Sequence, residues 1–199
     1  MTSGKRLAVS IGIAMLTTFA GLSAAQAQYG PPRPYYAPPP PRGVYRSGLV
    51  FGGSLGFGDI ASDGCGPYCG GGFFFEGHLG GMLNPRLALE GDFWGAVHRW
   101  DNGMGLGTTY HGLYTFAAQY WATDFFWLKG GFGFAQLNFG YDNTATPSQT
   151  GPGLLGAAGF EVVQSYNFAL DLQVRFGHGF YDTGPDINQV AFMIGVNWY

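Results

Sequence analysis

The sequence predicts an all-β protein, namely an eight-stranded antiparallel up-and-down transmembrane β-barrel. The last twelve residues, 188–199, place one apolar face on a strand: Val190, Phe192, Ile194, Val196 and Trp198. A two-residue period of this kind marks a β-strand, and it recurs back to Ser47. Charged residues make up only 11% of the chain, against about 25% in soluble domains. The 36 glycines and 18% aromatic residues suit the bends and interface girdles of a barrel that faces lipid.

The first segment, residues 1–27, is predicted to be a cleaved export signal. Lys5 and Arg6 precede an apolar stretch at 7–22, and the small residues Ala25 and Ala27 form a cleavage pattern. The alternative is a membrane-anchoring helix. The stretch is short for a helical span and ends in a cleavage pattern rather than a charged stop, which favours the signal.

Residues 28–46 are predicted to form a periplasmic spacer ahead of a barrel domain at 47–199. The segment 28–43 reads QYGPPRPYYAPPPPRG. Proline has no backbone N–H to donate to a sheet, and dense prolines favour an extended polyproline conformation. We therefore expect a disordered or semi-rigid spacer. Its tyrosines and arginines offer contacts to the cell wall or to another periplasmic partner.

Eight segments with a two-residue period are predicted to be the barrel strands. They are 47–59, 72–83, 87–98, 108–120, 125–141, 154–164, 168–180 and 188–199. Long connections alternate with short turns along the chain, which is the loop-and-turn asymmetry of outer-membrane barrels. An even number of strands returns both termini to the periplasmic side.

The fifth predicted strand changes its pattern part-way along. Phe126, Leu128, Phe132 and Phe134 share an outward face, but beyond Gln136 the apolar positions are 137, 139 and 141. An extra residue in one strand would shift the alternation in this way. The sequence therefore predicts a β-bulge near Gln136, with Leu137, Phe139 and Tyr141 facing outward.

The charged residues of the strand interiors all fall on the face opposite the apolar one. They are Glu76, Glu90, Asp92, Lys129, Glu161, Asp171 and Arg175. A Lys or Arg on the lipid face at mid-depth would cost about 2–4 kcal/mol. Eight strands leave an interior just wide enough for side chains, so we predict a polar network that plugs the lumen. The alternatives are a narrow porin-like channel for small solutes or ions, and a catalytic carboxylate pair.

The two cysteines lie four residues apart, as Cys65 and Cys69 in GCGPYCG. An exported protein meets an oxidising environment, which favours a local disulfide. Zinc binding is the alternative, but two thiolates without a nearby His or third Cys leave a tetrahedral site incomplete. No metal or cofactor is predicted, and the formal net charge of −3 argues against nucleic acid as a partner.

Together these features resemble the small eight-stranded outer-membrane β-barrels of the OmpA/OmpX type. The resemblance is carried by the signal at 1–27, the strands from 47 to 199 and the ending Gly195-Val196-Asn197-Trp198-Tyr199. It implies the outer membrane of a Gram-negative bacterium, with contact to its lipid and lipopolysaccharide. It also implies that the barrel-assembly machinery recognises Gly195, Val196, Trp198 and Tyr199. Family members typically end on an outward aromatic residue, whereas here the outward residue is Trp198 and Tyr199 faces inward.

The predicted role is structural or surface-interacting, with the external loops supplying specificity and with no enzymatic activity. The enzymatic alternative is a lipid A-modifying barrel, which needs a nucleophile or base beside a histidine near the outer rim. His98, His111 and His178 are expected toward that end, and the hydroxyls nearest to His111 in sequence are Thr108 and Thr109.

Overall fold

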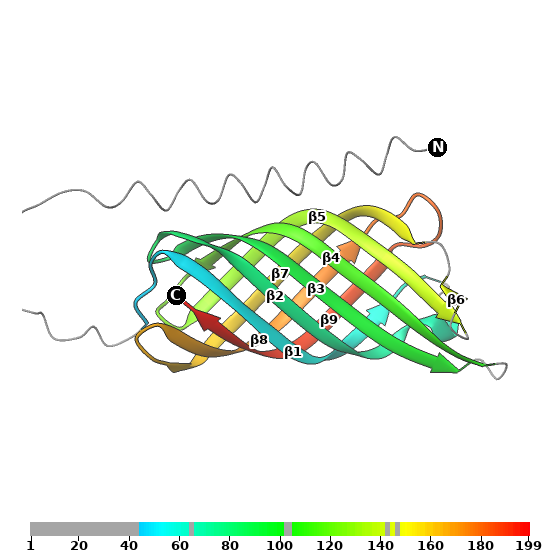
Figure 1. Ribbon diagram of the computed structural model, residues 1–199, viewed down its shortest axis with the longest axis horizontal. Coiled ribbons are helices and arrows are strands. Elements are labelled where there is room, and N and C mark those ends of the chain that lie inside the picture. The colour runs from blue at the N-terminus through cyan, green and yellow to red at the C-terminus, as the bar shows by residue number, and fades with distance from the viewer. Residues whose placement is uncertain (1–43, 64–65, 102–104, 142–143, 146–147) are drawn as a thin grey trace, which may run out of the picture. The chain divides into compact units, whose positions relative to one another are not determined.

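A computed structural model describes residues 44–63, 66–101, 105–141, 144–145 and 148–199. Eight long strands form a closed antiparallel sheet (Figure 1). They are β1 (Leu49–Ala61), β2 (Gly70–Asn84), β3 (Leu87–Asp101), β4 (Leu106–Trp121), β5 (Phe126–Tyr141), β7 (Gln149–Gln164), β8 (Phe168–Gly179) and β9 (Ile187–Trp198). A two-residue strand, β6 (Thr144–Ala145), extends β5 at one end, and a 3₁₀ turn, η1 (Gly66–Tyr68), lies between β1 and β2. The predicted signal and residues 28–43 of the predicted spacer lie outside the described residues.

The barrel closes because every long strand pairs with the next one along the chain and β1 pairs with β9. The closing seam matches Phe51 with Trp198 and Ala61 with Asn188. The remaining pairs are antiparallel as well. This up-and-down topology confirms the predicted fold class. Among the described residues, no helix is long and apolar enough to cross a membrane.

The two ends of the barrel differ in their connections. At the end that we call the turn end, short turns join β2 to β3, β4 to β5 and β7 to β8, and Tyr199 follows β9. In the first turn, Arg86 N donates to Asn84 Oδ1 at 2.9 Å, a local bond of the kind that favours Asn in turns. The opposite end, the loop end, carries the four longer connections and β6 (Figure 1).

The exterior of the barrel is apolar, as predicted. Phe57, Phe132 and Phe192 are about 70% exposed, and many other large apolar side chains also point outward. By contrast, the seven charged strand residues named above are all buried. A water-soluble barrel would place its apolar face inside, so this exterior suits hydrocarbon.

The structure shows that the predicted bulge at Gln136 is wrong. The pairing of β5 with β4 and with β7 runs past Gln136 without a shift. Leu137 is 2% exposed and Phe139 packs against buried lumen residues, so both point inward. The alternation therefore continues unchanged, and the lumen itself becomes apolar toward the loop end. The side chain of Tyr141 lies outside the described part of the chain.

Register shifts occur instead at Met82/Asn84, between β2 and β3, and at Glu161/Val163, between β7 and β8. The second shift turns both Val162 and Val163 outward, each about half exposed. β7 also begins five residues earlier than predicted, at Gln149. It includes Pro152, which is paired with Phe134 of β5 and whose carbonyl oxygen accepts from Phe180 N at 2.9 Å.

Two apolar clusters fill the lumen above and below its charged residues. The loop-end cluster contains Ile60, Phe74, Trp94, Ala96, Leu113, Ala117, Ala135, Leu137, Leu155, Tyr181, Ile187, Ala191 and Met193. The turn-end cluster contains Val50, Ala88, Trp121 and Trp127, with Tyr199 packed against it. The charged residues other than Glu161, which contacts Trp121 of the turn-end cluster, lie between these two clusters.

Candidate functional site

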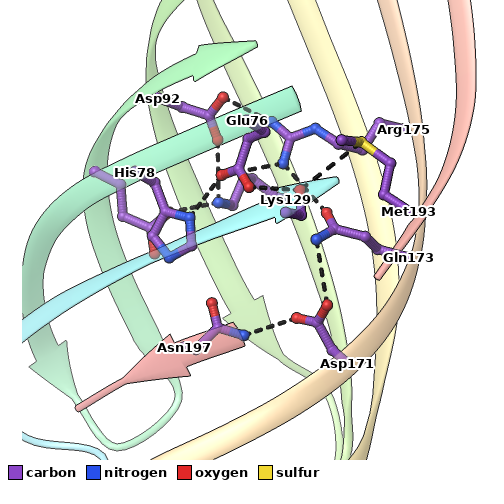
Figure 2. A network of polar contacts seen from close by, with 11 residues as sticks. Glu76, His78, Asp92, Lys129, Asp171, Gln173, Arg175, Met193 and Asn197 are labelled. Carbon is purple, nitrogen blue, oxygen red and sulfur yellow. Dashed lines mark hydrogen bonds and ion pairs between the residues drawn. The ribbon is translucent and has the colours of Figure 1, made fainter. Parts of the chain in front are cut away.

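The predicted polar network is organised around an ionic layer, which we define as Glu76, Glu90, Asp92, Lys129 and Arg175. Figure 2 labels these residues except Glu90. Lys129 Nζ lies 2.6 Å from Glu90 Oε2 and 3.1 Å from Asp92 Oδ2. Arg175 Nη2 lies 2.6 Å from Asp92 Oδ1, and its Nη1 lies 3.4 Å from Glu76 Oε1. All five side chains are almost completely buried. Each cation therefore holds two carboxylates, and Asp92 joins both cations.

The contact between Asp92 and Arg175 spans the barrel. Asp92 lies on β3 and Arg175 on β8, which are opposite each other in the ring of eight long strands. Lys129 reaches the same aspartate from β5. This ion pair therefore joins opposite walls of the barrel directly.

Neutral and weakly basic side chains extend the ionic layer. Glu76 accepts from Ser54 Oγ at 2.7 Å and lies 2.6 Å from His78 Nδ1. Asp171 stands apart from the two cations and accepts from Asn197 Nδ2 at 2.7 Å and Gln173 Nε2 at 3.2 Å. Alternation placed Ser54, His78 and Gln173 inside, but nothing in the sequence indicated which carboxylate each would meet.

Glu76, His78 and Asp92 bring one ligand atom each to within 4.8 Å of one another. This spacing would suit a metal ion. However, Arg175 contacts both carboxylates, and Lys129 contacts Asp92 as well. A divalent cation in this position would face two fixed positive charges at close range. The donor set therefore fits an ion-pair network better than a metal centre.

Glu161 belongs to a second cluster at the turn end, which we call the turn-end clamp: Arg46, Trp121, Glu161 and Tyr199. Arg46 Nη2 lies 2.5 Å from Glu161 Oε2, and its guanidinium stacks on the rings of Trp121 at 4.9 Å and Tyr199 at 5.5 Å. Glu161 Oε1 also accepts from Trp121 Nε1 at 2.7 Å and from Tyr199 Oη at 2.8 Å. Sequence analysis had assigned Arg46 to the spacer, yet its side chain is buried in the barrel mouth.

The last two residues, Trp198 and Tyr199, point to opposite sides of the barrel wall. Trp198 lies outside, with its ring 5.4 Å from that of Phe51 and 5.3 Å from that of Phe168. Tyr199 turns inward and joins the turn-end clamp. Recognition of Gly195, Val196, Trp198 and Tyr199 during assembly stays a prediction. So does the disulfide, because Cys65 lies outside the described residues.

Two of the histidines considered for an enzymatic site, His111 and His178, make no hydrogen bond to a hydroxyl group within the described part of the chain. His111 is fully buried in the loop-end cluster, with its ring 6.0 Å from that of Tyr181. Thr109 Oγ1 donates to Tyr68 O at 2.9 Å and accepts from Trp100 Nε1 at 3.1 Å. Neither of these two hydrogen bonds involves His111. His98 Nδ1 lies 2.8 Å from Gly71 O, and His178 Nδ1 lies 2.8 Å from Asn188 Oδ1.

A closed eight-stranded sheet with an apolar exterior and charged residues inside defines a small outer-membrane β-barrel, the fold and surface of a Gram-negative outer-membrane protein. Its shape is similar to two solved structures. One is Ail, the attachment invasion locus protein of Yersinia pestis, in complex with the heparin analogue sucrose octasulfate: 14% identity over 77% of this chain and 99% of that one, TM-score 0.58. The other is Neisserial surface protein A, with 17% identity over 76% of this chain and 97% of that one, TM-score 0.56. No protein-family model and no curated protein sequence matches the chain.

Proposed function

We propose that this protein is a plugged outer-membrane barrel with a structural or surface-interaction role, in which the loop end supplies any specificity. The observation that carries the proposal is the 2.6 Å contact between Asp92 and Arg175, on opposite walls of the lumen. A porin-like channel needs an aqueous path, whereas here long side chains meet at the barrel axis.

The energetics favour a plug that stays closed. Removing one partner of a buried ion pair typically costs about 3–5 kcal/mol, because the other charge is left uncompensated. A solute moving through the lumen would have to separate at least one such pair. It would also have to displace the bulky side chains of the loop-end cluster, such as Trp94 and Leu113.

Planar-bilayer recording tests the proposal. The full mature chain should show no steady conductance at either polarity, while an open porin reconstituted in the same bilayers serves as the positive control. A stable current of porin size would overturn the plug and favour the channel alternative.

We further propose that the barrel is not an enzyme. The arrangement of His111 and Thr109 supports this, because neither hydrogen bond of the threonine hydroxyl reaches the histidine. Mass spectrometry of lipid A from cells with and without the protein is the direct test. A mass change that depends on the protein, and is lost when His111 is replaced, would contradict it.

The same proposal sets the orientation of the barrel in the outer membrane. The turn end, with both described chain ends, would face the periplasm, and the loop end would lie outside among lipopolysaccharide. The proline-rich segment would then be placed for a cell-wall or other periplasmic partner. An epitope tag between Asp182 and Gly184 should be accessible on intact cells, and a tag after residue 43 only after permeabilisation. The reverse pattern would refute the orientation.

A further inference from the structure

A cleft of about 580 Å³ opens at the loop end of the barrel. It lies among the end of β5, the start of β7 and the β8–β9 connection, and its lining is Phe139, Ser148, Gln149, Thr150, Tyr181, Asp182 and Thr183. This volume falls within the range of roughly 300–1,000 Å³ that small-molecule sites occupy. The cleft is separate from the ionic layer and from the turn-end clamp.

The walls of the cleft are tied to the barrel. Ser148 Oγ accepts from Gln136 Nε2 at 3.0 Å, which holds the start of β7 against β5. Tyr181 N donates to Asp186 Oδ1 at 3.0 Å, and Ser62 Oγ donates to Asp186 O at 2.7 Å. The β8–β9 connection is thus tied to the barrel near both of its ends.

Most polar groups of the cleft remain available to a ligand. Within the described residues, no side-chain hydrogen bond engages Gln149, Thr150, Asp182 or Thr183. Gln149 is half-buried, and the other three are exposed. Together they offer a planar amide, a planar carboxylate and two hydroxyls beside the half-buried ring of Phe139.

The negative charge of the loop end disfavours anionic ligands. Among the described residues that line the cleft, Asp182 is the one carboxylate, and none is Lys, Arg or His. Of the 9 Lys and Arg residues in the chain, Arg99 is the one on the loop end among the described residues, where Asp59, Asp63, Asp101, Asp182 and Asp186 also lie. An anionic ligand would therefore meet net repulsion.

We propose that this cleft binds an uncharged saccharide, an inference that rests on the surface-interaction role proposed above. Amide and carboxylate side chains can each bond two neighbouring sugar hydroxyls, and Ser or Thr hydroxyls donate as well as accept. Phe139, which packs against the loop-end cluster, adds an apolar side chain to the same lining. Because the acidity of the loop end would also attract a cationic ligand, polyamines are included in the test.

The test uses the full mature chain in nanodiscs and a panel of neutral oligosaccharides of hexose and N-acetylhexosamine units. Their sulfated counterparts and a polyamine are tested alongside them. Saturation-transfer NMR followed by calorimetry should find at least one neutral saccharide that binds. Gln149→Ala and Asp182→Ala should each weaken that binding about tenfold, the loss of one good hydrogen-bonding group to a ligand. Asp63→Ala, which removes an exposed loop-end carboxylate outside the cleft, should leave it unchanged.

Heat-modifiable gel mobility confirms that each variant is folded. The proposal is overturned if no neutral saccharide binds, if the sulfated forms bind better, or if the two cleft variants bind as the wild type does. If only polyamines bind, the cleft is a cation site instead and the saccharide proposal also fails. The bilayer recording is independent of these results, because a closed lumen with no saccharide binding would overturn this inference alone.

Discussion

The middle and the loop end of the lumen are filled in opposite ways. In the middle, two cations and three carboxylates meet in pairs 2.6–3.4 Å apart. Toward the loop end, the side chains of Trp94, Leu113 and Leu137 pack against one another, although they belong to the same inward-facing set of positions. Ion pairs therefore join opposite walls in the middle of the lumen, whereas packed apolar side chains fill the space between the walls toward the loop end.

Glycine makes the apolar packing possible. A Cβ atom added to Gly177 would lie 2.5 Å from Trp94 Cζ3 and 2.4 Å from Leu113 Cδ1. These distances are below van der Waals contact, so the indole of Trp94 occupies the space that a side chain on β8 would need. The ionic layer depends on which charges are present, whereas the loop-end cluster depends on volume.

The largest expected effect comes from breaking the ionic layer. Arg175→Met removes a cation from two buried carboxylates, Asp92 and Glu76, and should lower the free energy of unfolding by about 3–5 kcal/mol. Urea unfolding in detergent micelles or bilayers, followed by gel mobility, measures the change. The matched control Arg99→Met removes an exposed arginine and should change stability by less than about 0.5 kcal/mol. A loss of less than about 1 kcal/mol for Arg175→Met would show that the ion pairs are not needed to hold the walls together.

The loop-end cluster should respond to volume rather than charge. Gly177→Val forces a side chain into the space held by Trp94 and should cost about 1–3 kcal/mol. Gly156 lies on β7 with no atom within 4 Å of an added Cβ, so Gly156→Val is the matched control and should be neutral or slightly stabilising. Equal losses from both substitutions would mean that the lumen is not packed as tightly as the contacts indicate.

The same contrast explains what could be predicted from the sequence. Alternation predicted eight strands, the lipid-facing side and the inward direction of the seven charged strand residues, because a charged side chain on a strand that faces lipid avoids the hydrocarbon. It failed at Leu137 and Phe139, because an apolar side chain suits both hydrocarbon and an apolar lumen. Only the unbroken register of β5 distinguishes the two.

Partners across the lumen were beyond the reach of the sequence. Which carboxylate Lys129 or Arg175 meets depends on the stagger of distant strands, which alternation does not encode. Arg46 was missed for a different reason. It follows a proline-rich segment and precedes the first alternating residue, so no periodic pattern indicates that its side chain turns into the barrel mouth.

The turn-end clamp should be less sensitive than the ionic layer. Arg46→Met removes an ion pair and two cation–π contacts, yet Glu161 keeps the donors of Trp121, Tyr199 and Gln164. Because the carboxylate is not left unpaired, we expect a loss of about 1–2 kcal/mol. Urea unfolding checks this against Arg86→Met, an exposed arginine at the same end. A loss as large as that of Arg175→Met would show that the clamp contributes as much to stability as the ionic layer does.

The smallest effect concerns Tyr181, the residue that joins the loop-end cluster to the β8–β9 connection. Burial, and then the negative charge of Asp186, raise the pKa of Tyr181 above its ordinary value of 10.0. The folded protein therefore keeps this proton at a pH where the unfolded chain has released it, so stability falls as pH rises above about 10. Tyr181→Phe removes this contribution, and its unfolding free energy should fall less steeply than that of the wild type between pH 9 and 11, by up to about 1 kcal/mol. The other tyrosines titrate in both proteins and cancel in the difference. Parallel curves would mean that the phenol is as well solvated in the barrel as in the unfolded chain, and that the apolar cluster ends below Tyr181.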